Sequence, residues 1–444
     1  MLNSNYSKQL SKRQRIKETT LVVGMDIGYN FNAMALMNKE GQILGRYPRL
    51  YNSRNGFDYF VKVIESAKEK NGLKDVLIGL EPTGHYWRKI AYFSKSRGYE
   101  VRFVRTTALK HQRELDESSS AKSDVKDAFT IANITREGKY IDTIIEDGIY
   151  RQLRTLSRLR ERIQKYNIGS KNALRAVLDD YFPELKNIFR LMNAKGLWAI
   201  LENCPFPEDA LTLGRTKIAD IIAKSSRRKA VAAEKASVLY QAAGKSIGLK
   251  QIGTADRYKM KMFLEEVKRS EAQIKELGKE MEKLLKQVPY HEYLLSLPGV
   301  GPLSAAVFLG ELGNPFYFKT YKQIIKYAGY DPIERDSGQY ISRRMISKKG
   351  RWLLRKYLYF MAMRAIQFSP YFKEYYHRKL DSKRLSKKQA LCATVIKLVK
   401  VLSAVLRKRR MFTEDVPTLN PILHKTGCGG SRIVTSRRPI AAWA

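Results

Sequence analysis

Cysteine and histidine are scarce in this chain of 444 residues, which contains three cysteines and five histidines. Cys204, Cys392 and Cys428 lie far apart, so the sequence excludes a disulfide framework and fits a reducing compartment. No pair of cysteines or histidines has the spacing of zinc ligands, and we therefore expect no structural zinc site.

The chain also lacks a long apolar run without interruption. Its first twenty residues are polar and basic and contain no apolar core of a signal peptide. The longest uncharged run lies between Glu292 and Glu311, and the PGVGP segment at 298–302 breaks it. We expect a buried segment there rather than a membrane span, and no membrane partner.

Acidic residues are few relative to basic ones. The chain has 83 lysines and arginines against 43 aspartates and glutamates, a formal net charge of +40. Such an excess repels itself until a polyanion neutralises it, and the usual polyanion is nucleic acid. An anionic membrane surface is the alternative, although basic lipid-binding stretches are usually short and juxtamembrane. Half of the excess lies in residues 319–410, which carry 25 basic and 5 acidic residues.

The hydrophobic pattern predicts how the chain is divided. A hydrophobic content of 44% excludes a mainly disordered protein, and the length favours two or three domains. We predict a basic flexible arm over 1–20. Residues 21–147 should form a mixed α/β domain, because a meander of two or three strands precedes alternating strands and helices. The predicted strands are 21–30, 31–38, 75–81 and 101–104, with a turn at Glu40-Gly41, and the predicted helices are 57–70, 85–97 and 121–137.

Residues 148–289 are predicted to be a helical linker. Its second long helix carries a heptad seam with one polar interruption, at Ser270. The two long helices could pair with each other or with another subunit, and a coiled coil and a plain helical bundle both remain open. We expect a mostly helical domain over 290–410 and a disordered tail over 411–444. The seam consists of Val267, Ser270, Ile274, Leu277, Met281, Leu284 and Val288.

Two carboxylates are predicted to lie on strands of the α/β domain. In LVVGMDIG, alternation places Val23, Met25 and Ile27 on one face and Asp26 on the other, between two glycines that leave room for a ligand. Glu81 follows the apolar run VLIGL, at the carboxyl end of a strand, where open α/β sheets place their sites. The plainer alternatives are an aspartate in a turn at the strand end and a solvated loop glutamate.

A second pair of carboxylates, Asp124 and Asp127, lies three residues apart on a predicted helix, so that both project from one face. A solvated first turn is the alternative, since acids also complement the helix dipole. Together with Asp26 and Glu81, they could hold two Mg²⁺ ions, which prefer oxygen ligands and stabilise both oxygens of a phosphoryl displacement.

The C-terminal part carries two further motifs. LLSLPGVGPLSAAVFLGELG reads as helix, turn and helix, resembling a helix-hairpin-helix element in which Gly299 and Gly301 let the backbone approach a phosphate. A tight turn in a helical core is the alternative. Downstream, Ser337 lies in a polar turn as a candidate nucleophile, with Tyr340 as its rival. The basic residues expected to contact nucleic acid are Arg343, Arg344, Lys348, Lys349 and Arg351.

These motifs together resemble the insertion-sequence transposases that have an N-terminal DEDD, RuvC-like domain and a C-terminal serine domain, relatives of the Piv invertases. The matching segments are GMDIG, LEPTGHYW, KSDVKDA, LPGVGP and DSG…ISKKGRWLLRK. The resemblance covers about 20–145 and 290–385, whereas the N-terminal arm and the tail after 411 do not match the common core.

The resemblance implies an RNase H-like N-terminal domain, a helical coiled-coil linker and a mostly helical serine domain. It implies a DNA recombinase that moves its element, guided by a structured non-coding RNA, in the cytoplasm of a bacterium or archaeon. Asp26, Glu81, Asp124 and Asp127 would bind Mg²⁺, and Ser337 would form a covalent phosphoserine link in a homo-oligomer, a dimer or a tetramer. The rival classes are a RuvC-like nuclease without serine chemistry and a non-catalytic nucleic-acid-binding protein.

Overall fold

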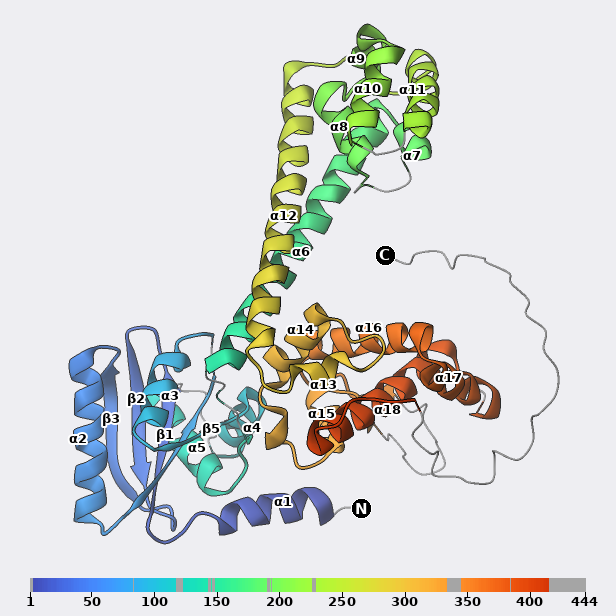
Figure 1. The fold of residues 1–444 in the computed structure, drawn as a ribbon. Coiled ribbons are helices and arrows are strands. Elements are labelled where there is room, and N and C mark those ends of the chain that lie inside the picture. The colour runs from blue at the N-terminus through green and yellow to red at the C-terminus, as the bar shows by residue number, and fades with distance from the viewer. Residues whose placement is uncertain are drawn as a thin grey trace, which may run out of the picture. The chain divides into compact units, whose positions relative to one another are not determined.

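The protein was analysed as a computed structural model, which divides into two compact units, Met1–Glu146 and Asp147–Ala444 (Figure 1). The first is a mixed α/β unit and the second is mostly helical. The structure describes residues 3–82, 84–116, 123–142, 145, 148–189, 192, 194–225, 229–333, 345–383 and 385–414.

The first unit is built on a five-stranded sheet in the order β3-β2-β1-β4-β5. The central strand β1 is antiparallel to β2 and parallel to β4, while β3 is antiparallel to β2 and β5 is parallel to β4. The strands are β1 (Thr20–Ile27), β2 (Phe31–Met37), β3 (Ile43–Tyr51), β4 (Asp75–Leu80) and β5 (Glu100–Phe103), and the helices are α1 (Asn3–Gln14), α2 (Arg54–Lys70), α3 (Trp87–Ser96), α4 (Thr106–Asp116) and α5 (Asp124–Arg136).

The two faces of β1 pack against different helices, as its alternation predicts. Val23, Met25 and Ile27 join one hydrophobic cluster with residues of α2 and α3. On the opposite face, Val22 packs with Ala132 of α5. The prediction that Asp26 lies on the face opposite Val23, Met25 and Ile27 is therefore confirmed by the packing around it.

Residues 3–14 form the helix α1 where the sequence predicted a flexible arm. The helix packs against the end of its own unit: Lys12 Nζ donates to the carbonyl of Tyr140 at 2.7 Å and lies 4.8 Å from the centroid of its ring. Gln9 Nε2 donates to the carbonyl of Glu137 at 3.2 Å. These hydrogen bonds join residues that lie 128 positions apart in the sequence, and they hold α1 in place. A prediction made from the first twenty residues alone could not include them.

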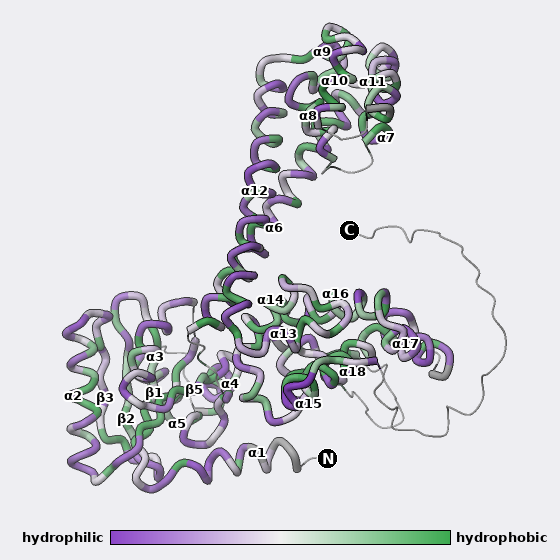
Figure 2. The backbone as a smooth tube through the Cα atoms, in the orientation of Figure 1, coloured by the Kyte–Doolittle hydropathy of each residue, from purple (hydrophilic) through white to green (hydrophobic). Residues whose placement is uncertain are grey.

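The second unit begins with a long helical pair. Helices α6 (Gly148–Tyr181) and α12 (Thr254–Lys286) pack along each other in opposite directions (Figure 1). The polar interruption of the predicted seam has a partner, because the Asn167 side chain donates to Ser270 Oγ at 2.7 Å inside the pair. Apart from the residues that face α6, α12 is mainly hydrophilic (Figure 2).

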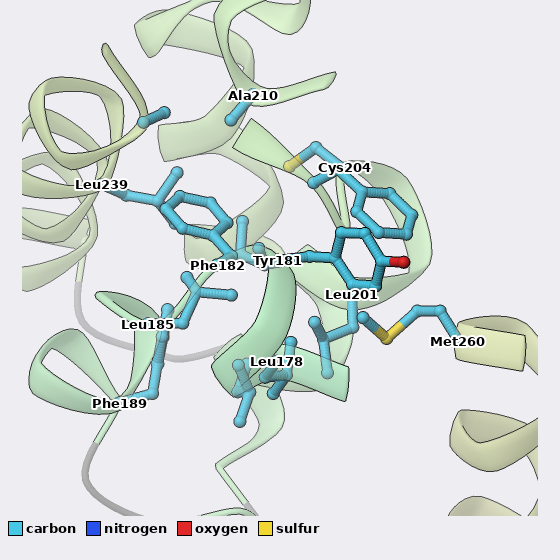
Figure 3. Close-up of a cluster of buried hydrophobic side chains, with 14 of the residues drawn as sticks. Leu178, Tyr181, Phe182, Leu185, Phe189, Leu201, Cys204, Ala210, Leu239 and Met260 are labelled. Atoms are coloured by element: carbon cyan, nitrogen blue, oxygen red, sulfur yellow. The ribbon is translucent and has the colours of Figure 1, made fainter. Parts of the chain in front are cut away.

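The chain segment that connects α6 to α12 forms a group of short helices with its own hydrophobic core. The sequence pattern predicted a helical linker there but not this core. Phe182, Leu201 and Leu239 are buried there with Cys204 (Figure 3). The residues of this core come from the ends of the long pair as well as from the short helices, so that they fix the far ends of α6 and α12. The short helices are α7 (Leu185–Ile188), α8 (Lys195–Asn203), α9 (Pro207–Leu213), α10 (Arg215–Ser225) and α11 (Lys229–Gly244).

The remaining helices complete the second unit. Among the described residues, α18 (Lys387–Lys408) alone is long and apolar enough to cross a membrane, and 56% of that stretch is buried inside the structure, as in a core helix. Of the predicted tail, 415–444 lie outside the described residues, whereas Phe412 stacks on Phe372. The elements are α13 (His291–Leu295), α14 (Pro302–Leu312), η1 (Pro315–Tyr317), α15 (Tyr321–Ala328), β6 (Pro332–Ile333), β7 (Met345–Ile346), α16 (Trp352–Phe368), α17 (Pro370–Lys383) and α18 (Lys387–Lys408).

Candidate active site

The carboxylates Asp26 and Glu81 lie at the ends of two neighbouring parallel strands. Met25 of β1 pairs with Leu80 of β4, so Asp26 and Glu81 occupy the next positions of the same register. Residues paired in a parallel ladder share a face, and both carboxylates therefore belong to the face that α5 covers. Glu81 is buried, with 9% of its surface exposed, so it is not the solvated loop glutamate of the plainer alternative.

Two glycines let α5 approach this face closely. A Cβ at Gly24 would lie 2.0 Å from the carbonyl oxygen of Ala128, and a Cβ at Gly79 would lie 1.8 Å from Thr135 Oγ1. Both positions require the absence of a side chain. Ala128 also packs with Ala33, which pairs with Asp26. The first turn of α5 is thereby held beside the strand end that carries Asp26.

The two aspartates of α5 differ in their surroundings. Asp127 is 3% exposed, whereas Asp124 is exposed to solvent. Arg113 of α4 places Nη2 2.5 Å from Asp127 Oδ2, although that oxygen accepts no well-aligned hydrogen bond. Arg113 therefore supplies the countercharge that a buried carboxylate requires. Sequence reasoning missed Arg113 because it predicted no helix over 106–116.

The donor set suits a hard divalent cation in its chemistry, since every candidate ligand is a carboxylate oxygen. A buried Asp127 oxygen without an aligned hydrogen bond fits that chemistry. As placed, however, no three His, Cys, Asp or Glu side chains of the described chain are grouped to hold a metal ion. The four-acid Mg²⁺ site thus remains a prediction, supported by the shared face and the type of donor.

The serine segment is described only at its base. Ser337, Tyr340, Arg343 and Arg344 fall within 334–344, outside the described residues. On either side of that segment, β6 and β7 pair antiparallel. The base is well bonded: the Ser347 hydroxyl donates to Asp331, and Arg355 donates to the carbonyl of Lys348 at 3.1 Å.

The glycine turn combines two different roles. The expected helix, turn and helix are present as α13, 296–301 and α14. At Gly299, with φ +86°, a Cβ would lie 2.4 Å from the backbone nitrogen of Ala365, so this glycine permits packing on α16. The space that its side chain would occupy is filled by α16, and its contact with a phosphate remains a prediction. Gly301 faces open space before α14, and its contact with a phosphate remains a prediction.

The basic residues after β7 also divide into two kinds. Lys348 and Lys349 are exposed, which suits contact with a polyanion. Arg351 is largely buried, with 19% of its side chain exposed: its guanidinium lies 3.5 Å from Glu311 and 4.8 Å from the centroid of the Tyr327 ring. Arg351 therefore lies in a charge cluster with Glu311, and its contact with nucleic acid remains a prediction.

Comparison with known proteins gives two family matches and several relatives. Residues 23–183 match a family described as "Transposase", and residues 291–377 match the "Transposase IS116/IS110/IS902 family". An insertion element IS116 protein of 44.8 kDa from Streptomyces clavuligerus is 24% identical over 89% of this chain and 96% of its own length. The mini-circle putative transposase for IS117 of Streptomyces coelicolor is 23% identical, over 82% and 88%. A pilin gene-inverting protein of Moraxella bovis is 29% identical over 28% of this chain and 38% of its own length.

Proposed function

Since this chain belongs to the IS116/IS110/IS902 family of transposases and is a DNA transposase, we propose that it cuts and rejoins DNA through a covalent link to Ser337, and so moves its own insertion sequence. The observation that carries the proposal is the common face on which Asp26 and Glu81 end two parallel strands beside the first turn of α5. Carboxylates at the ends of adjacent strands are placed for chemistry on a phosphate.

In this proposal the first unit is an RNase H-like, RuvC-like domain. Asp26, Glu81, Asp124 and Asp127 would hold Mg²⁺, which stabilises charge on phosphate oxygens when it is bound. The Ser337 hydroxyl attacks phosphorus, the bond from phosphorus to the 3′ oxygen breaks, and a 5′-phosphoserine forms. The proton lost by the serine balances the one gained by the 3′ oxygen, which leaves as a hydroxyl. One phosphate ester replaces another, so rejoining needs no ATP. Arg343 and Arg344 stabilise the transition-state charge, and loss of one such donor costs about 3–4 kcal/mol.

A structured RNA from the element's non-coding end would select the donor and target DNA. The enzyme would act as a homo-oligomer, a dimer or a tetramer, in the cytoplasm of a bacterium or archaeon. The paired helices α6 and α12 would serve as a coiled-coil connector. The composition supports the nucleic-acid partners, because a net charge of +40 favours binding to polyanions.

Trapping the protein–DNA adduct tests the proposal. The full chain is incubated with end-labelled element-junction DNA, element RNA and Mg²⁺, denatured, and analysed for labelled protein. The native chain should form an adduct, and Ser337→Ala should bind DNA normally without forming one. Asp26→Asn should abolish strand exchange while RNA binding persists. An adduct that survives in Ser337→Ala and disappears in Tyr340→Phe would make the tyrosine the nucleophile. Nicks without an adduct in the native chain would instead support the nuclease alternative.

A further inference from the structure

Three arginines interact with one buried carboxylate in the second unit. Glu311, near the end of α14, has a side chain that is fully buried. Arg158 of α6 binds it through two hydrogen bonds, from Nε at 2.8 Å and from Nη2 at 3.3 Å. Arg351 Nη1 lies 3.5 Å from the second carboxylate oxygen. The two arginines reach Glu311 from segments about 150 and 40 residues away along the chain.

A third arginine joins them because α6 and α14 cross closely. A Cβ at Gly310 would lie 2.7 Å from the backbone nitrogen of Arg154, so only glycine permits this crossing. Arg154 precedes Arg158 by one helical turn, and residues four apart lie on the same side of a helix. Arg154 interacts electrostatically with Glu311, Arg158 and Arg351.

The cluster carries more positive charge than its carboxylate neutralises. Three guanidiniums surround one carboxylate, which leaves a formal excess of two charges. Within the described part of the chain, the side chain of Arg154 has neither a hydrogen bond nor an ion pair, and its electrostatic interaction with Glu311 is outweighed by burial and by the other two arginines. Burial, and then repulsion by Arg351 and Arg158, lower the pKa of Arg154 to about 10. It is still charged at pH 7, although burial and the neighbouring arginines disfavour that charge.

We propose that Arg154, Arg158 and Arg351 bind a backbone phosphate of the DNA, and that Glu311 holds the guanidiniums in place. A phosphodiester matches the cluster because its oxygens accept paired guanidinium hydrogen bonds. DNA is favoured over RNA because Arg351 follows β7, the strand that leaves the serine segment. The inference rests on the proposed function only in taking DNA as the substrate.

A purely structural ion-pair network is the alternative, and it predicts the opposite effect on stability. If the cluster only stabilised the fold, removing any of its arginines would lower the melting temperature. If Arg154 instead serves to bind a phosphate, then in the free protein its removal would relieve the electrostatic repulsion that it feels from Arg158 and Arg351. The free protein would then be as stable as before or more stable, while DNA binding would weaken. The two explanations therefore differ in the sign of one measurable quantity.

The experiment compares Arg154→Gln with Arg162→Gln in the full chain. Arg162 lies two turns further along α6, is exposed, and donates to the hydroxyl of Tyr166, so it controls for the loss of one charge. Binding of a labelled duplex of fixed sequence, and of a single-stranded RNA of the same sequence, is measured by anisotropy over a range of salt. Melting temperatures are measured without nucleic acid. A duplex of any sequence serves, because phosphate contacts do not depend on sequence.

For Arg154→Gln we expect duplex binding about tenfold weaker near 0.1 M salt and a log–log salt slope smaller by about 0.9, with an unchanged or higher melting temperature. Arg162→Gln should stay close to the native chain. Equal slopes for the two variants, or a lower melting temperature with an unchanged slope, would overturn the inference. So would a loss confined to RNA, which would make this an RNA site. Normal binding by a native chain that forms no DNA adduct would defeat the proposed serine chemistry and leave this inference standing.

Discussion

The contact between β4 and α5 holds the strand that leads to Glu81, and Gly79→Ala tests it. The new Cβ would lie 1.8 Å from Thr135 Oγ1, whereas ordinary contacts begin at 3.4 Å, so the neighbour must move by roughly 1.6 Å. Thr135 cannot simply rotate away, because its hydroxyl is buried and donates to the carbonyl of Ile131 at 2.7 Å. Overpacking of this kind costs about 1–3 kcal/mol, and we expect the first unit to be destabilised by that amount.

The effect on activity should exceed the effect on stability. Glu81 follows Gly79 by two residues, and α5 carries Asp124 and Asp127. A displacement of about 1 Å at a reacting group lowers a rate roughly 100-fold. We expect a comparable loss in the initial rate of strand exchange, measured well below the melting temperature of the variant. Scanning calorimetry of the full chain measures the stability of the two units in the same preparation.

A second substitution shows whether Thr135 is the cause. In Gly79→Ala with Thr135→Ala, the nearest remaining atom is the Cβ of residue 135, at 2.9 Å, so the required shift falls to roughly 0.5 Å. The double variant should regain most of the stability lost by Gly79→Ala. Gly278→Ala is the matched control, since a Cβ added at that helical glycine would have nothing within 4 Å of it beyond its own helix. If Gly79→Ala alone were as stable and active as the native chain, the close docking of α5 on β4 would be refuted.

Three further outcomes test the second unit. Asn167→Ala should destabilise it by about 1–2 kcal/mol in calorimetry, because Ser270 loses its partner across the helical pair; no change would mean that the pair does not depend on this bond. Burial raises the pKa of Cys204 to about 11, so alkylation followed by mass spectrometry at pH 8 should be slow until unfolding, and stability should fall as pH rises from about 9 toward 11. Despite burial, the hydrogen bonds from Arg158 lower the pKa of Glu311, so its stabilising effect should be present at neutral pH and lost below about pH 4. Glu311→Gln should cost about 2 kcal/mol or more at pH 7 and remove that acid dependence, and a variant as stable as the native chain would contradict the pairing.

Much of the first unit was predictable because its signals are local. The predicted strand 75–81 corresponds to Asp75–Leu80, and the predicted helix 57–70 to Arg54–Lys70. That helix begins earlier because the Ser53 hydroxyl accepts a hydrogen bond from the backbone of Gly56 at 3.1 Å. By contrast, α4 was missed, since it buries little besides Leu109 and shows no apolar stripe. It is held by tertiary contacts that a periodicity argument does not contain.

The candidate site was predictable to a different extent for each of its parts. Alternation along β1 placed Asp26 on the correct face because a period of two follows directly from the sequence. The partners of buried charges were not predictable in this way. Arg113 pairs with Asp127, although the sequence of α4 shows no hydrophobic periodicity that would have placed Arg113 on a helix. Arg158 pairs with Glu311, which lies 153 residues further along the chain. In the sequence, Glu311 only marked the end of an uncharged run, and nothing near it indicated a countercharge.

The two units use the same device to hold charged side chains. Gly24 and Gly79 bring α5 onto the sheet in the first unit, and Gly310 brings α14 against α6 in the second. Helices α5 and α14 each also carry a buried carboxylate that pairs with an arginine: Asp127 of α5 with Arg113 of α4, and Glu311 of α14 with Arg158 of α6. Both carboxylates are buried, so each is costly to leave unpaired, whereas Arg158 keeps about half of its side chain exposed. A surface lysine such as Lys348 can bind any polyanion in many orientations, whereas an arginine paired with a buried carboxylate is already oriented before any ligand binds.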